Sequence, residues 1–253
     1  MLLIISSTPL SLGHSFSSNE SAAFLALVKA IKTEAQLVLE NLANNNTALA
    51  SEHANRASAL ITASVHGRIA ESNLTLADDL SNVLSTLKSS TESSSDASTA
   101  SDIDIVISDL DAIIDGIIAA RIDPDQLDNS TIQALTIVEL LDRVLINYGD
   151  AYEVGFDMTN MSMANTSATE GFELVNITSY QTAQVLATKV QELFNSQLSN
   201  SSADTQSLDN IATALQELVS TMYNRGSPND AMMIVHTKIH PNFITAFGLE
   251  FRT

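Results

Sequence analysis

Apolar side chains recur along most of this chain with the spacing of an α-helix. In the stretch of residues 22–43 one stripe runs through Phe24, Leu27, Val28, Ile31, Ala35, Val38, Leu39 and Leu42, and the charged side chains fall largely off it. Positions three and four residues apart share one helix face, so this pattern predicts an amphipathic helix. Similar patterns occupy residues 48–67, 69–87, 102–122, 132–156, 174–198, 204–224 and 228–247. We therefore expect an all-α protein, an antiparallel bundle of about seven helices.

A Ser-rich segment, residues 89–100, lacks this periodicity and is typical of a flexible linker. It divides the chain into an N-terminal helical segment, residues 16–88, and a C-terminal helical segment, residues 101–253. The first segment has small, Ala-rich stripes that would bury only a thin core by themselves. We therefore expect it to dock on the second, so that both form one continuous bundle. Within the N-terminal segment, Gly67 is expected to end the second helix.

The composition narrows the classes of function. The chain carries a formal charge of −19 with only 11 Lys and Arg, which argues against nucleic acid as a partner. Cysteine is absent, so thiolate metal sites and cysteine nucleophiles are excluded. No phosphate-binding loop, dinucleotide fingerprint or nucleophile elbow occurs, and we expect no enzyme activity. Charges interrupt every apolar run after the first residues, so the protein is not expected to span a membrane.

Two features indicate export from the cell. Residues 1–15 begin with an apolar run followed by small residues, and they resemble a signal peptide, although the basic residues that usually start one are missing. The alternative is a mildly apolar terminus that stays on the protein. N-x-S/T sequons, the acceptors of N-glycosylation, are also frequent, at Asn19, Asn45, Asn73, Asn129, Asn160, Asn165, Asn176 and Asn200. Helix capping by Asn, Ser and Thr is an alternative explanation for part of this excess.

Three of the seven methionines lie within six residues of a polar stretch, at Met158, Met161 and Met163. Their thioether sulfurs favour Cu(I), and two or three of them on a flexible loop can surround one ion. The triplet resembles the methionine motifs of copper-import transporters and of some extracellular copper carriers. The alternative is a loop that folds back and buries these side chains against the helices.

A second candidate ligand set lies near the C-terminus. Met232, His236 and His240 are spaced four residues apart, so a continuous helix would place a thioether and two imidazoles on one face. Pro241 disfavours a helical conformation at His240 and could spoil this geometry. The alternative is that both histidines are structural residues at the edge of the core. His53, which falls on an apolar stripe, is expected to be a hydrogen-bonded core residue.

Three stretches together resemble a family of secreted, helix-rich proteins from ammonia-oxidising archaea. They are EAQLVLENLANNNTALASEHANRASALI, ELLDRVLINYGDAYEVGFDMTNMSM and MMIVHTKIHPNFITAFGL. The resemblance implies an exported helical protein and carries no activity with it. Because these organisms depend on copper enzymes outside the cytoplasmic membrane, it also favours a role in handling copper.

Two hypotheses therefore remain. The first is an exported helical protein that binds or carries copper through the methionine stretch and the Met/His helix face. The second is a non-catalytic structural or protein-interaction module of the cell envelope that holds no metal. Its partner would be another envelope protein, and its histidines and methionines would serve only in packing.

Overall fold

The computed structural model describes residues 19–92, 98–157, 162–164 and 173–250. In chain order, the elements are α1 (Glu20–Ala43), α2 (Thr47–Ala59), α3 (Ala63–Ala70), α4 (Leu74–Glu92), α5 (Ser98–Arg121), α6 (Pro124–Leu127), α7 (Ser130–Ala151), β1 (Gly155–Asp157), β2 (Ser162–Ala164), α8 (Ile177–Leu193), the π-helix η1 (Phe194–Leu198), α9 (Thr205–Tyr223), α10 (Pro228–Met233), the π-helix η2 (Ile234–Ile239) and α11 (His240–Phe247). The prediction of an all-α protein is confirmed. A three-residue antiparallel hairpin, β1–β2, is a small addition to the helices.

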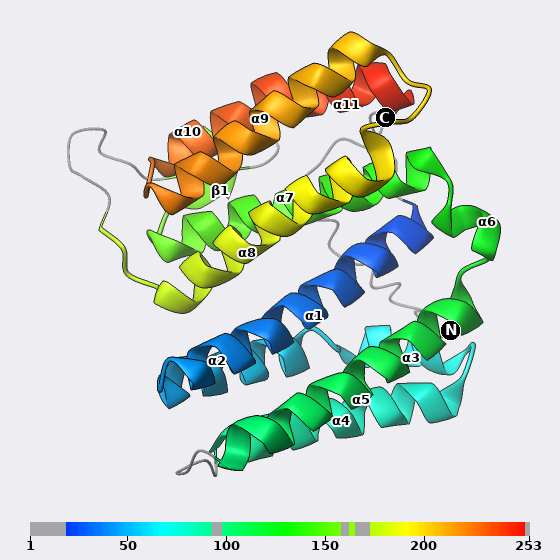
Figure 1. Cartoon of the computed structure of the whole chain (residues 1–253), viewed down its shortest axis with the longest axis vertical. Coiled ribbons are helices and arrows are strands. Elements are labelled where there is room, and N and C mark those ends of the chain that lie inside the picture. The colour runs from blue at the N-terminus through cyan, green and yellow to red at the C-terminus, as the bar shows by residue number, and fades with distance from the viewer. Residues whose placement is uncertain (1–18, 93–97, 158–161, 165–172, 251–253) are drawn as a thin grey trace, which may run out of the picture.

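The helices pack as successive pairs along the longest axis of the molecule (Figure 1). The pair α4–α5 forms one end, α1–α2 follows, then α7–α8, and α9 with α10, η2 and α11 forms the other end. In this view α1 lies between α5 and α8, so the two predicted segments are in contact along their length. One apolar cluster extends through all four pairs and includes Ile31, Leu84, Leu141, Phe194 and Phe243.

Asparagine side chains begin several of these helices. Asn19, Asn129 and Asn176 each accept a hydrogen bond from a backbone N–H in the first turn of α1, α7 and α8. Asn73 does the same for Leu76 at the start of α4, at 3.2 Å. All four belong to predicted sequons, so helix capping accounts for part of the sequon excess. Three of them, Asn73, Asn129 and Asn176, are nevertheless exposed.

The structure differs from two local predictions, the helix end at Gly67 and the length of the Ser-rich linker. Gly67 was expected to end a helix but lies inside α3, because the chain already breaks after α2 and the Thr62 side chain caps the start of α3. The predicted linker, residues 89–100, is shorter in the structure, since α4 continues to Glu92 and α5 begins at Ser98. Ser and Thr have only weakly unfavourable helix propensities, and packing of neighbouring turns offsets them. The remainder of that segment lies outside the described residues.

Candidate functional site

The predicted Met/His face is divided among three elements. Met232 lies in α10, His236 in the π-helix η2, and His240 is the first residue of α11. The helical path runs without a break through residues 228–247, but it widens to a π-helix at η2, where the His240 N–H donates to the Val235 carbonyl, five residues earlier. Pro241 follows at the first turn of α11, where its missing N–H costs little. The wider π-turn lets the chain pass this proline without ending the helical path.

Although a π-helix replaces the regular α-helix here, the His236 and His240 imidazoles lie next to each other. Their ring centroids are 5.1 Å apart and the planes meet at 73°. His240 is 6% exposed and Met232 is 4% exposed, whereas His236 is partly exposed. Burial lowers the pKa of His236, which favours the neutral imidazole, the form that ligates metals. On the parallel row of this helical stretch, Val235, Ile239 and Phe243 are fully buried, and Phe247 is partly buried against the core.

The methionine stretch is described only in part. Met158 and Met161 lie outside the described residues, and Met163 lies in β2, where its backbone pairs with Phe156 of β1. Met163 therefore belongs to a strand and not to the irregular loop that was expected. The hairpin follows the C-terminal end of α7 closely.

The hairpin and α10 share one end of the molecule. Near the end of α7 the Tyr148 hydroxyl donates to the Gly226 carbonyl, just before α10, at 2.6 Å. β1, which precedes Met158, and α10, which carries Met232, both contact α7. Within the described ranges, no group of three or more His, Asp or Glu side chains could hold a metal ion. A site here would depend on thioether ligands in addition to the two imidazoles.

A buried polar cluster, which sequence reasoning missed, joins α1, α2, α7 and α8. At its centre is the Glu34 carboxylate, which is 3% exposed and contacts three side chains. Its oxygens lie 2.6 Å from His53 Nδ1, 3.1 Å from Arg56 Nε and 3.0 Å from the Thr182 hydroxyl. Arg56 also donates to Ser179, at 3.1 Å, and to Asn147. His53 is fully buried and hydrogen-bonded, as its place on an apolar stripe predicted.

The cluster stabilises the junction and is poorly placed for chemistry. His53 is 0% exposed, so its ring cannot meet a substrate. His53 Nε2 lies 2.9 Å from Gln181 Oε1, and the Gln181 and Asn41 amides pair with each other at 3.2 Å. Every strong acceptor in the cluster thus faces a donor from another helix. Buried charges satisfied in this way fix the relative position of the helices that carry them.

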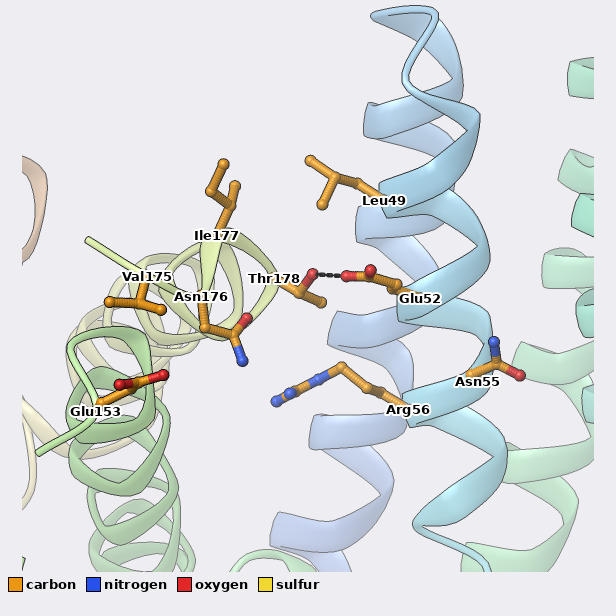
Figure 2. Close-up of a pocket in the computed structure, with 9 residues that line it drawn as sticks. All are labelled: Leu49, Glu52, Asn55, Arg56, Glu153, Val175, Asn176, Ile177 and Thr178. Carbon is orange, nitrogen blue, oxygen red and sulfur yellow. Dashed lines mark hydrogen bonds between the residues drawn. The ribbon is translucent and has the colours of Figure 1, made fainter. Parts of the chain in front are cut away.

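Beside this cluster a groove of about 710 Å³ opens between α2 and the start of α8 (Figure 2). The Thr178 hydroxyl donates to the Glu52 carboxylate across it, and the Arg56 side chain extends from α2 toward α8. Val175 and Ile177 on its rim are 53% and 49% exposed. The groove therefore combines acidic, basic and exposed apolar groups, a mixture that suits contact with a protein surface.

Comparison with known proteins provides no family for this chain. No protein-family model, curated protein or solved structure matches it. None of the described helices has an apolar stretch long enough to cross a membrane.

Proposed function

We propose that the protein is an exported, non-catalytic copper-binding or copper-carrying protein. Its ligands would be Met158, Met161, Met163, Met232, His236 and His240, held at one end of an antiparallel helical bundle. The observation that carries the proposal is the pair of imidazoles whose centroids are 5.1 Å apart, next to the helix that contains Met232. Thioethers favour Cu(I), and imidazoles accept Cu(II) as well, so a mixed set would retain the ion in either redox state.

Export and glycosylation belong to the same proposal. The apolar residues 1–15 would act as a signal peptide, and the sequons would be modified outside the cytoplasm. Five of the sequon asparagines, Asn45, Asn73, Asn129, Asn176 and Asn200, are exposed. Their exposure makes them accessible to a glycan.

Copper titration tests the metal site directly. Purified protein is titrated with Cu(I) against a competing chelator, and then with Cu(II). We expect stoichiometric binding that weakens by at least about tenfold in the His236→Gln/His240→Gln variant and in the variant with Met158, Met161 and Met163 changed to Leu. The matched controls are Met233→Leu, at a 49% exposed position beside Met232, and His66→Gln, in α3. Equal affinities in ligand and control variants, or no binding by the wild type, would disprove the proposal.

A second candidate is a structural or interaction module of the cell envelope that binds no metal. The exposed Val175 and Ile177 favour it, because they lie close together on the rim of the α2–α8 groove, and grouped apolar side chains of this kind can contact a protein partner. Cell-envelope extracts are passed over wild-type protein and over a Val175→Ser/Ile177→Ser variant. A partner retained only by the wild type, together with absent copper binding, would favour this function over the first.

A further inference from the structure

A separate cavity of about 440 Å³ lies between α1, α5 and α8, on the part of α1 that faces both neighbours. Lys29 and Lys32 of α1 and Lys189 of α8 line it, with Leu39, Ile107 and Leu193 as its apolar side. Figure 1 shows these three helices side by side, with α1 in the middle. The cavity has no residue in common with the proposed copper site.

Two of the three lysines that line this cavity form ion pairs with carboxylates. Lys32 Nζ lies 3.1 Å from both Asp111 and Asp115, and Lys189 Nζ lies 3.0 Å from Glu192. Lys29 makes no ion pair or hydrogen bond with any residue that the structure describes, although it is half-buried. Lys29 is thus the lysine of this cavity that has no direct carboxylate partner among the described residues, although the protein has a net charge of −19.

A second polar group in the same cavity also lacks a partner. The hydroxyl of Thr33, one helical turn after Lys29, is buried, and the described part of the chain offers it no hydrogen bond. Thr33 as a whole is 2% exposed. A buried hydroxyl without a hydrogen bond is costly, so such a group is usually satisfied by a water molecule or a ligand. Lys29 and Thr33 together provide an ammonium and a hydroxyl on the same helix face.

The surroundings of Lys29 make its positive charge unfavourable. Burial, and then the positive charges of Lys189 and Lys32, lower the pKa of Lys29. An anion bound next to the ammonium would oppose both effects. A ligand with one negative charge fits this cavity better than a ligand with two. A second negative charge would lie near Asp111 and Glu192, which are already paired with Lys32 and Lys189.

We propose that this cavity binds an aliphatic monocarboxylate. Its carboxylate would accept hydrogen bonds from the Lys29 ammonium and the Thr33 hydroxyl, and its alkyl chain would lie against Leu39, Ile107 and Leu193. The volume is within the range of small-molecule pockets. Three apolar side chains line the cavity together with six polar ones, among them Gln36 and Asp111. The inference stands independently of copper binding.

Isothermal titration of the whole chain with octanoate tests the proposal. We expect saturable binding that falls by about tenfold or more in Lys29→Met, because a charge-assisted hydrogen bond is lost, and by a smaller factor in Thr33→Val. The control is Lys88→Met, at an exposed position of α4, which should bind like the wild type. Octylamine and inorganic phosphate, titrated into the wild type, should show no comparable binding.

Several results would overturn the proposal. They are absence of octanoate binding by the wild type, equal affinity in Lys29→Met and Lys88→Met, and binding of octylamine or phosphate as tight as that of octanoate. Thermal melts of the ligand-free variants provide a second readout that does not depend on the ligand. Lys29→Met should melt at or above the wild-type temperature because it removes a half-buried charge that has no direct partner and lies near Lys32 and Lys189. A lower melting temperature would contradict this account of Lys29.

Discussion

The junction of α1 and α2 with α7 and α8 differs in chemistry from the pair α4–α5. The buried side chains of α4 and α5 are almost all Leu and Ile, among them Leu84, Leu110 and Ile114. The junction instead buries a carboxylate, an imidazole and part of a guanidinium around Glu34, in addition to apolar groups. The named side chains of both regions are buried, but only those of the junction need particular hydrogen-bond partners at particular distances.

The two regions therefore contribute differently to the fold: the apolar pair mainly stabilises it, and the polar junction mainly fixes the relative position of the helices. Apolar contacts are non-directional, so a Leu/Ile interface can tolerate small shifts of one helix along the other. The Glu34 carboxylate tolerates no such shift, because it would lose the donors from α2 and α8 and remain buried without compensation. We infer that the polar cluster sets how the N-terminal helices dock on the C-terminal ones, whereas the α4–α5 pair contributes mainly free energy.

The largest expected effect follows from removal of the central carboxylate. Glu34→Ala leaves His53, Arg56 and Thr182 without their shared acceptor, and we expect a loss of about 4 kcal/mol in the free energy of unfolding. Urea denaturation monitored by circular dichroism measures it. Glu34→Gln, which retains the shape and part of the hydrogen bonding, should cost less. A loss below about 1 kcal/mol in Glu34→Ala would show that the cluster does not hold the junction.

Truncation of a buried leucine in the α4–α5 pair should lower the free energy of unfolding by somewhat less. Leu84 is 2% exposed, and Leu84→Ala removes buried methyl groups and leaves a cavity, for an expected loss of about 3 kcal/mol. The control is Leu74→Ala in the same helix, at a 60% exposed position, with an expected change within about 0.5 kcal/mol. Equal losses at both positions would contradict the assignment of Leu84 to the core.

Loss of a helix cap should have a smaller effect. The Asn176 side chain accepts from the Ser179 N–H at 3.0 Å where α8 begins, so Asn176→Ala should destabilise the protein by about 1 kcal/mol. Thermal and urea unfolding measure this change. The control is Asn55→Ala, at an exposed position inside α2, where alanine should be neutral or slightly stabilising. If both variants behave alike, the cap contributes nothing.

Cutting the chain between the two regions should have the smallest effect. A specific protease sequence is inserted between Glu92 and Ser98, and the purified protein is cleaved there. The fragments should elute together from a sizing column, because α4–α5 and the polar junction both connect them. Two folded fragments that elute separately would contradict the single continuous core.

Much of the helical architecture follows from the sequence alone. The spacing of apolar residues predicts each long helix, and asparagines such as Asn129 and Asn176 mark helix starts because their side chains satisfy free N–H groups. The pairing of Val235, Ile239 and Phe243 on a core face was predictable for the same reason. These features depend only on residues within a few turns of one another.

Tertiary structure decided the rest, since the periodicity of one helix cannot report what covers its other faces. Glu34 falls largely off the apolar stripe of α1, yet α2 and α8 enclose it and supply its donors. Likewise Lys29 and Lys189 are far apart in sequence and meet only because α8 packs on α1. The burial of a polar group depends on partners from distant segments, and the free energy that makes it tolerable exists only when those partners are in place.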